Sequence, residues 1–379
     1  MRSIVDAALA RHEELVRKEQ VRAPDAAKSW QGSPDDAAIM EMAQHNVVIK
    51  IVGCGGGGSN TINRLTEMGV TGAEMCAVNT DATHLLHVHA PRKILIGKKI
   101  TKGLGAGAIP QTGEEAAKES ESELKAYLNG SNIVFVTAGM GGGTGTGSAP
   151  MVAKQAKEMG CLTMGVVTMP FKGEGGGRMD NAEWGLAKMV HYCDTTITIP
   201  NDKLLELVPK LPIEAAFKVA DEILVTCIKG ITEILTRPGL VNIDYADLLT
   251  VMKEGGVAMI GLGESEADRN RLEDAVKEAL HSPLLGEVDA SKAKGALIRV
   301  VGGSDLSISE AEKAAEIITN AINPNARVIW GCTIDPSYDG KVSVLLVLTG
   351  VRNKQMMGKG ADVGVVSGRA ESLGIDSVR

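Results

Sequence analysis

The sequence predicts an α/β fold in which a doubly wound parallel sheet is followed by a long central helix and a second, smaller α/β domain. From residue 47 onward, short apolar and β-branched runs alternate with amphipathic helical patterns, which is typical of such sheets. Two long glycine-rich segments also follow two of these runs. Ligands bind at the carboxyl ends of the strands in this fold class, so we expect the functional site there.

The apolar runs are expected to be strands buried on both faces of the sheet, because they are nearly continuous and rich in β-branched residues. They lie at 47–53, 74–81, 93–97, 132–139, 161–170 and 194–200. Helical periodicity is found between them at 59–69, 112–128 and 148–159.

One long helix is predicted within 211–238. Its apolar positions run from Ile213 to Leu235 with steps of one, three or four residues, which forms a single stripe. Pro238 and Gly239 end it, because proline cannot continue a helix and glycine readily takes positive φ. At ~1.5 Å per residue the helix is about 35 Å long, enough to connect two domains.

The chain is therefore divided into five regions: 1–45, 46–210, 211–238, 239–350 and 351–379. The first is interpreted as a short amphipathic helix and a flexible tether, with a tail of no function as the equal alternative. The fourth is the second α/β domain, and the last loses periodicity and is expected to be a flexible tail. Expected helices in the fourth region are 268–280 and 309–322, and expected strands are 296–303, 326–335 and 341–350.

Composition excludes several function classes. The net charge of −7, from 40 Lys and Arg against 47 Asp and Glu, argues against a nucleic-acid partner. No apolar run is long enough to cross a bilayer, so we expect a soluble, intracellular protein without membrane insertion. The 6 cysteines contain no Cys-x-x-Cys pair, and the spacing of His84, His87 and His89 suits no single face, so no protein metal site is expected.

The first glycine-rich segment, 53–60, contains G-x-G-x-x-G at Gly53, Gly55 and Gly58. Glycines let the backbone approach a phosphate, and the following helix offers unpaired N–H groups. Taken alone, this segment also suits a dinucleotide-dependent dehydrogenase with Asp81 as ribose ligand, or a tight structural turn.

The second segment, 139–150, again follows a buried strand and opens a helix. Two anion-binding loops on neighbouring strands fit an extended polyphosphate better than the single pyrophosphate of NAD. Thr144 and Thr146 add hydroxyl donors. Because no G-x-x-x-x-G-K-[ST] motif is present, the phosphate charge must be met by backbone dipoles and a cation, for which we expect Mg²⁺.

With these loops, the sequence resembles the tubulin/FtsZ superfamily. GGGTGTGSAP at 141–150 is similar to the superfamily signature, and further similar motifs follow in order over about 47–350. They are GCGGGGSN (53–60), AVNTDA (77–82), GLGAGAIP (103–110), the pair Glu174 and Arg178, IPNDKLL (199–205) and GLVNIDYADLLTVM (239–252). The resemblance implies a GTP-binding domain and a GTPase that polymerises into the ring that divides prokaryotic cells.

The resemblance also implies a GTP site. Residues expected at the phosphates and sugar are Gly56, Gly57, Gly58, Ser59, Asn60, Gly142, Gly143, Thr144, Gly145 and Thr146. Glu174 would hold the ribose with Arg178 beside it, and the three glycines between them make this geometry less certain. Phe217 would stack on guanine and Asp221 would accept its hydrogen bonds. Without the resemblance, these four would be read as a surface ion pair, a core aromatic and a solvated carboxylate.

The segment 242–247 is expected to be a loop that enters the nucleotide pocket of the neighbouring subunit. There Asp244 and Asp247 would position the water that attacks the γ-phosphate, and Asn242 would orient the loop. Taken alone, the pattern is better explained as an Asp capping the next helix. Only the resemblance favours catalysis.

The expected ligands are GTP and GDP, with Mg²⁺ bound through the phosphates. The expected partners are further copies of the chain, head to tail, together with membrane-anchoring and division-regulating proteins, in the cytoplasm at the division site. An NAD-dependent oxidoreductase and a tubulin-like regulator that does not polymerise are the alternatives.

Overall fold

The computed structural model describes residues 47–207, 213–237, 239–266, 270–286 and 288–351. The chain separates into two units, 1–46 and 47–379, and every described residue belongs to the second. The predictions for 1–45 and for the tail beyond Val351 lie outside the described residues.

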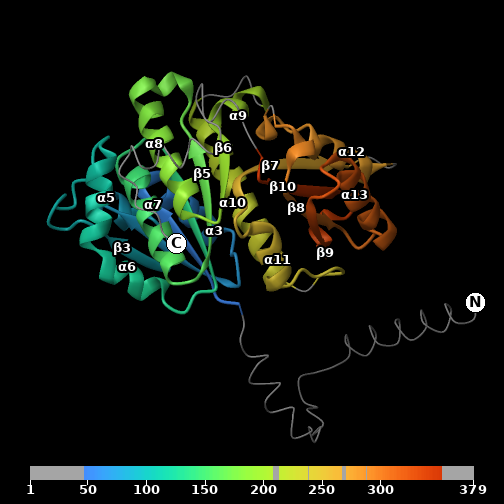
Figure 1. Cartoon of the computed structure of the whole chain (residues 1–379), viewed down its shortest axis with the longest axis horizontal. Coiled ribbons are helices and arrows are strands. Elements are labelled where there is room, and N and C mark those ends of the chain that lie inside the picture. Colours follow the sequence, from blue (N-terminus) through green and yellow to red (C-terminus); the bar gives the residue numbers. More distant parts are fainter. Residues whose placement is uncertain (1–46, 208–212, 238, 267–269, 287, 352–379) are drawn as a thin grey trace, which may run out of the picture. The chain divides into compact units, whose positions relative to one another are not determined.

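A ten-stranded sheet forms the centre of the described unit, in the order β3-β2-β1-β4-β5-β6-β7-β10-β8-β9 (Figure 1). The strands are β1 Ile49–Cys54, β2 Ala73–Asn79, β3 Arg92–Leu95, β4 Ile133–Gly139, β5 Leu162–Met169, β6 Thr195–Pro200, β7 Gly256–Ser265, β8 Gly295–Gly302, β9 Arg327–Ile334 and β10 Val342–Thr349. Strands β1 to β6 are all parallel, as predicted. Their order reverses between β1 and β4, the position at which such sheets bind ligands.

Helices cover both faces of the sheet. One face carries α3 Gly55–Glu67, α4 Ala82–His87, α9 Asn201–Leu207, α10 Ile213–Thr236 and α11 Tyr245–Met252. The other carries α5 Pro110–Glu119, α6 Glu121–Leu128, α7 Thr144–Glu158 and α8 Gly176–Tyr192, and then α12 Arg271–Leu280 and α13 Ile308–Ala321 over the later strands. Short 3₁₀ turns are η1 Lys172–Glu174, η2 Pro283–Leu285, η3 Ala290–Lys292 and η4 Pro336–Tyr338.

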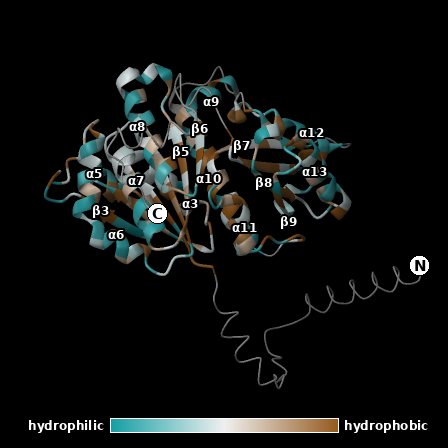
Figure 2. Cartoon of the chain, in the orientation of Figure 1, coloured by the Kyte–Doolittle hydropathy of each residue, from teal (hydrophilic) through white to brown (hydrophobic). Residues whose placement is uncertain are grey.

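The core is aliphatic, as the scarcity of aromatic residues requires. Phe135 in β4 is the largest fully buried side chain, and Ile, Leu, Val, Ala and Met make up most of the rest. Figure 2 shows the strands and α10 as hydrophobic, with hydrophilic residues on the outer helices.

Two element boundaries differ from the prediction. The first glycine-rich segment is not a loop before the helix expected at 59–69, because α3 already begins at Gly55 and the glycines form its first turn. The predicted helix 112–128 is two helices, α5 and α6, which break at Ser120. The Ser120 hydroxyl accepts a hydrogen bond from the Gly97 backbone, which ties the break to the end of β3.

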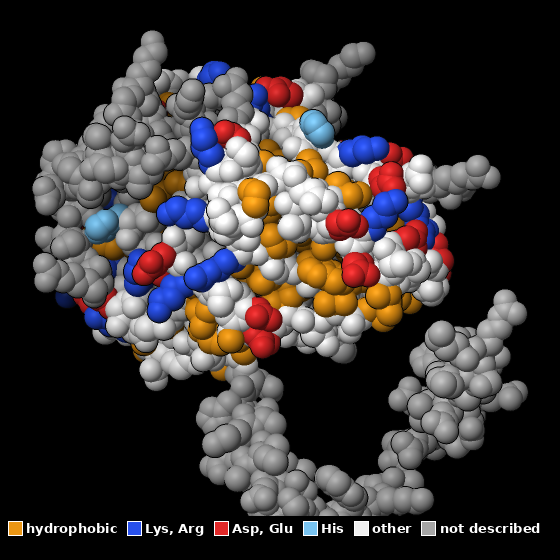
Figure 3. All heavy atoms as spheres, turned by 45° about the vertical axis from the view of Figure 1, so that its right-hand side comes forward, with side chains coloured by type: hydrophobic (Ala, Val, Ile, Leu, Met, Phe, Trp, Pro, Cys, Tyr) orange, Lys and Arg blue, Asp and Glu red, His pale blue; other side chains and the backbone are white. Residues whose placement is uncertain are grey.

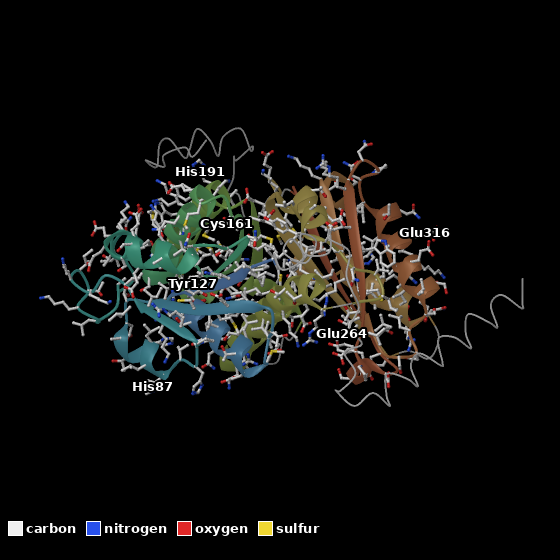
Figure 4. The ribbon with its side chains drawn as sticks, turned by 90° about the horizontal axis from the view of Figure 1, so that it is seen from below. His87, Tyr127, Cys161, His191, Glu264 and Glu316 are labelled. Carbon is white, nitrogen blue, oxygen red and sulfur yellow. The ribbon has the colours of Figure 1, made fainter. Side chains whose placement is uncertain are left out.

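The predicted second domain shares the sheet of the first. Strand β7, which the sequence analysis did not identify, pairs in parallel with β6 through Thr195 and Gly256 and antiparallel with β10. Helix α10 agrees with the predicted central helix and packs against strands of both parts. Figure 4 shows Tyr127 and Cys161 on the first part, and Glu264 and Glu316 on the second.

Candidate nucleotide-binding site

The two glycine-rich segments follow β1 and β4, the strands on either side of the point where the strand order reverses. They touch through main-chain atoms. Gly55 has φ +71°, and a Cβ on it would lie 2.6 Å from the Gly145 nitrogen. A Cβ on Gly145 would lie 2.9 Å from the Gly139 oxygen. No side chain fits between these loops, so glycine is required at both positions.

The first turns of α3 and α7 present backbone N–H groups at this junction. Neither Cys54, the N-cap of α3, nor Gly143, the N-cap of α7, makes a side-chain capping bond. The first N–H groups of a helix have no partner within the helix and carry the positive end of its dipole. Two such helix ends side by side form a site suited to an anion with several phosphates.

A pocket of about 460 Å³ lies at this junction. Most of the predicted ligands line it, namely Gly56, Gly57, Asn60, Gly142, Gly143, Thr144, Gly145, Glu174, Arg178, Phe217 and Asp221. The structure thus brings residues from α3, the end of β4, the start of α7 and the distant helix α10 to one cavity. Its volume is in the range of pockets that hold small molecules.

Three predicted ligands, Gly58, Ser59 and Thr146, are not among the lining residues. All three are buried. The Thr146 hydroxyl accepts a hydrogen bond of 2.8 Å from the Gly141 nitrogen, so it shapes the loop from behind. Of the two threonines expected to donate from their hydroxyl groups, Thr144 lines the pocket, and its Oγ1 lies 2.6 Å from Oγ1 of Thr80.

Asp81, the ribose ligand of the dehydrogenase alternative, has a local structural role. Its carboxylate accepts a hydrogen bond of 2.9 Å from the His84 nitrogen and caps α4. It is not among the residues that line the pocket. This geometry does not favour the dehydrogenase reading.

Glu174 and Arg178 form an ion pair at the edge of the pocket, with 2.7 Å between Oε2 and Nη1. Glu174 also accepts a hydrogen bond from the Phe171 nitrogen at 2.8 Å, which fixes the carboxylate. Arg178 is exposed, so the pair itself contributes only about 0–1 kcal/mol to stability. Both groups are therefore placed where they can contact a ligand.

Helix α10 contributes Phe217 and Asp221, four residues apart on one face. Phe217 is 41% exposed, which is unusual for so large an apolar side chain, and its ring meets that of Phe171 edge to face at 5.1 Å. Burial raises the pKa of Asp221 to about 6, against the opposing effect of Arg64. A free aromatic face beside a half-buried carboxylate suits a flat heterocycle that carries N–H donors.

The sequence analysis missed Asn201, which also lines the pocket. Its side chain is buried, and Oδ1 has no hydrogen-bond partner among the described residues. Asn201 lies in the quoted motif 199–205, so its position was marked but given no role. An unpaired buried amide at a pocket wall is suited to bind a polar ligand edge.

The segment 242–247, called the acidic segment from here on, follows two residues that are hydrogen-bonded to the edge strand β9. The Leu240 nitrogen donates to the Cys332 oxygen at 2.8 Å, and the Cys332 nitrogen donates to the Val241 oxygen at 3.1 Å. Asn242 accepts a hydrogen bond from the Gly239 nitrogen at 2.7 Å, which closes the turn after α10. Asn242 therefore stabilises the turn that precedes this segment.

The structure corrects the prediction that 242–247 is entirely loop. Tyr245 begins α11, Asp244 is its N-cap, and Asp247 lies in its first turn. The Asp244 carboxylate accepts a hydrogen bond of 2.7 Å from the Asp247 nitrogen, so the capping interpretation holds for Asp244. Both aspartates are nevertheless exposed and able to meet another molecule.

The pocket and the acidic segment lie at opposite ends of β4. The Tyr245 hydroxyl donates to the Asn132 oxygen at 3.2 Å, at the amino end of this strand. Gly139, at its carboxyl end, lines the pocket. The strand has seven residues, so its two ends lie about 20 Å apart at ~3.3 Å per residue. Asp244 and Asp247 thus stand far from the pocket of their own chain.

Two further observations concern other kinds of site. Within the described ranges, no group of three or more His, Cys, Asp and Glu side chains could hold a metal ion, and no helix is both long and apolar enough to span a bilayer. On the face shown in Figure 3, acidic and basic side chains lie next to one another.

Family models match both parts of the chain. Residues 48–209 match the GTPase domain of the Tubulin/FtsZ family, and residues 256–352 match the C-terminal domain of the FtsZ family.

Curated proteins and solved structures agree with these models. The chain is 50% identical to Cell division protein FtsZ 1 of Archaeoglobus fulgidus, over 100% of both chains. It is 53% identical to Cell division protein FtsZ 1 of Pyrococcus furiosus, over 89% of this chain and 90% of that protein. A solved structure, an empty FtsZ dimer of M. jannaschii, is 48% identical with a TM-score of 0.80, over 87% of this chain and 99% of that one.

Proposed function

The chain belongs to the FtsZ family of cell-division GTPases, and on this premise we propose that one subunit holds GTP in its glycine-lined pocket while the acidic segment of the next subunit hydrolyses it. The family's members assemble into filaments during division. The proposal assigns the individual steps to residues of this chain.

The separation along β4 is the observation that carries the proposal. Tyr245, which lies between Asp244 and Asp247, contacts the amino end of β4, and the carboxyl end of this strand, where Gly139 lines the pocket of the same chain, is about 20 Å further along. Both aspartates are exposed and so can enter a second molecule's pocket. Stacking the acidic end of one subunit on the pocket end of the next completes the site.

Phosphate binding falls to the main chain. The helix ends at Gly55 and Thr144 direct N–H groups at the phosphates, and Arg178 is the only basic side chain that lines the pocket within the described chain. This shortage of positive charge fits a divalent cation. Mg²⁺ would be held by phosphate oxygens and water, and would neutralise charge that develops at the γ-phosphate.

Base recognition falls to the far wall of the pocket. Phe217 stacks on the guanine ring, and the Asp221 carboxylate accepts from the two N–H groups on its pyrimidine edge. The unpaired Oδ1 of Asn201 can accept a hydrogen bond from a further donor of the nucleoside, such as a ribose hydroxyl. Adenine lacks this pair of donors, so an ionised Asp221 would leave the site selective for guanine.

Hydrolysis requires a positioned water more than covalent chemistry. Two aspartates of α11, Asp244 at its N-cap and Asp247 in its first turn, accept hydrogen bonds from that water. They orient the water in line with the γ-phosphate that the neighbouring subunit holds. Asn242 holds the turn that presents them.

The contact between subunits joins two different surfaces, so it repeats into a filament instead of closing into a dimer. Leu104 is 87% exposed. It lies beside the pocket, because the nitrogen of its neighbour Gly105 donates a hydrogen bond to the Thr80 backbone oxygen, and the Thr80 hydroxyl is hydrogen-bonded to that of Thr144. Leu240 is 49% exposed beside the acidic segment. We place both side chains in the subunit contact, where they lose contact with water. Loss of the γ-phosphate then weakens the contact and permits turnover.

The cell-division role places the filament in the cytoplasm at the division site. Membrane-anchoring and division-regulating proteins are its proposed partners there.

GTP turnover measured against protein concentration tests the shared site. Activity per subunit should be near zero at low concentration and rise steeply once filaments form, while GTP binding is already complete. Activity per subunit that stays constant as the protein is diluted would contradict the proposal.

A further inference from the structure

A buried ion pair links the central helix to the second part of the sheet. Glu233, near the end of α10, is 2% exposed, and its Oε2 lies 2.7 Å from Nη2 of Arg299 in β8. Glu233 Oε1 lies 3.1 Å from Arg237, one turn further on. The chain then passes directly into the segment that carries the proposed catalytic acids.

This pair is poorly suited to stabilising the fold. Burial lowers the pKa of Arg299, which shows that removing its charge from water is costly. Arg299 Nε and Glu233 Oε1 have no hydrogen-bond partner in the part of the chain that the structure describes. Arg237 lies close to Glu233 Oε1 but makes no hydrogen bond with it. Buried pairs with unmet bonds are often no more stable than apolar side chains of the same size. A geometric role explains the pair better.

The packing around the pair transmits its position to the acidic segment. A Cβ on Gly230, one turn earlier in α10, would lie 2.6 Å from Leu345, so the helix sits directly on the sheet. A Cβ on Gly239 would lie 2.3 Å from the Cys332 oxygen, so the chain after the helix also sits against β9. Between these two contacts, Glu233 joins α10 to Arg299 of β8, and Ile234 packs against β9, where a Cβ on Gly331 would lie 2.9 Å from it.

We propose that the Glu233–Arg299 pair is a positioning device for hydrolysis, which holds the end of α10 on β8 and so sets where Asp244 and Asp247 meet the neighbouring subunit. The inference rests on the proposed function. Phe217 and Asp221 lie on the same helix, so guanine binding and acid placement share one rigid element. Neither Glu233 nor Arg299 touches the nucleotide.

The test uses the full-length chain with the double substitution Glu233→Gln and Arg299→Met. Removing both charges avoids the isolated buried charge that either single change would leave; glutamine has the size of glutamate, and methionine is an unbranched apolar side chain shorter than arginine. The matched control is Arg271→Met with Asp305→Asn, which removes an ion pair from the same part of the chain without contact to α10.

The expected result is a loss confined to turnover. Assembled subunits of the double variant should hydrolyse GTP about 10–100-fold more slowly, because a small misplacement of catalytic groups has effects of this size. GTP affinity, the thermal unfolding midpoint and the amount of sedimented filament should match those of the unaltered chain. The control pair should retain normal turnover.

Mixed filaments identify which half of the site is impaired. Gly142→Glu places a carboxylate at the phosphate pocket, where a Cβ meets nothing, and leaves the acidic segment intact. Asp247→Ala does the reverse. If the pair positions the acids, the double variant should regain turnover when it is mixed with Gly142→Glu and gain nothing when mixed with Asp247→Ala.

The outcomes separate the two proposals. Recovery with Asp247→Ala, or full turnover of the double variant alone, would overturn the positioning role while leaving the shared site in place. If Gly142→Glu and Asp247→Ala sediment together and still show no hydrolysis, the shared site itself is wrong.

Discussion

The two ends of β4 contribute to the proposed reaction in contrasting ways. At the carboxyl end the pocket is built from main-chain groups, and Gly55 and Gly145 are so close that no side chain fits between them. At the amino end Asp244 and Asp247 act through exposed side chains on an ordinary helix start. A main-chain site restricts residue type at many positions, whereas the acidic site depends on two charges.

The contrast predicts how each end responds to substitution. Changes at the acidic end should impair turnover and leave binding and folding intact. Changes around the pocket should alter nucleotide affinity or assembly. The four predictions below follow this division from the largest expected effect to the smallest.

The largest effect is expected for Asp247→Ala. Loss of a group that positions the attacking water should slow hydrolysis about 10²–10⁴-fold, while GTP binding and filament formation persist. Asp289→Ala, at another exposed helix cap, is the control and should keep normal turnover. Phosphate release and sedimentation measure the two properties, and filaments of Asp247→Ala with normal turnover would refute its role.

Asp244 separates capping from catalysis. Asparagine caps helices as well as aspartate, so Asp244→Asn should leave stability unchanged and still slow hydrolysis about 100-fold. Asp244→Ala should lose the same activity and in addition about 1 kcal/mol of unfolding free energy. Denaturant unfolding and phosphate release distinguish the two variants. Full activity in Asp244→Asn would show that this residue is a cap and nothing more.

A smaller effect is expected at the apolar edge of the pocket end. Burying a leucine contributes about 1.5–3 kcal/mol, so Leu104→Glu should raise the concentration needed for assembly about 10–100-fold without changing GTP affinity. Ile308→Glu is the control, because Ile308 is an exposed side chain of the same size as leucine in the second part of the chain. Light scattering against concentration gives both values, and equal thresholds would remove Leu104 from the contact.

The smallest effect concerns pH. Burial raises the pKa of Asp221 to about 6, so below this pH the carboxyl is protonated and can no longer accept hydrogen bonds from both guanine N–H groups with its two oxygens. GTP affinity should therefore fall about tenfold between pH 7 and pH 5. Asp221→Asn is the comparison, because titration of the phosphates affects both proteins alike. An equal pH dependence in the two would exclude the carboxylate from base recognition.

Much of the pocket was predictable because short sequence patterns indicate its chemistry. Glycine runs directly after buried strands indicate a main-chain anion site, and the resemblance added the partners Phe217 and Asp221 from a distant helix. Asn201 was missed because a single amide in a motif has many possible roles. Its unpaired oxygen in the pocket wall became visible only with the fold.

The acidic end was less predictable. Taken alone, the pattern of 242–247 is better explained as a helix cap, and the structure shows that Asp244 is one. Strand β7 was also overlooked, because two glycines interrupt its apolar run and weaken the strand signal. Because β7 was not predicted, its pairing with β6, which joins the two parts into one sheet, was not predicted either.

By itself the sequence determined the order of strands and helices, the long central helix and the two glycine-built loops, because hydrophobic periodicity and glycine placement are local properties of a chain. Only the tertiary structure decided that the acids lie a strand's length from the pocket, and that Glu233 and Arg299 meet in the core. These depend on which distant segments pack together, and no local pattern records that choice.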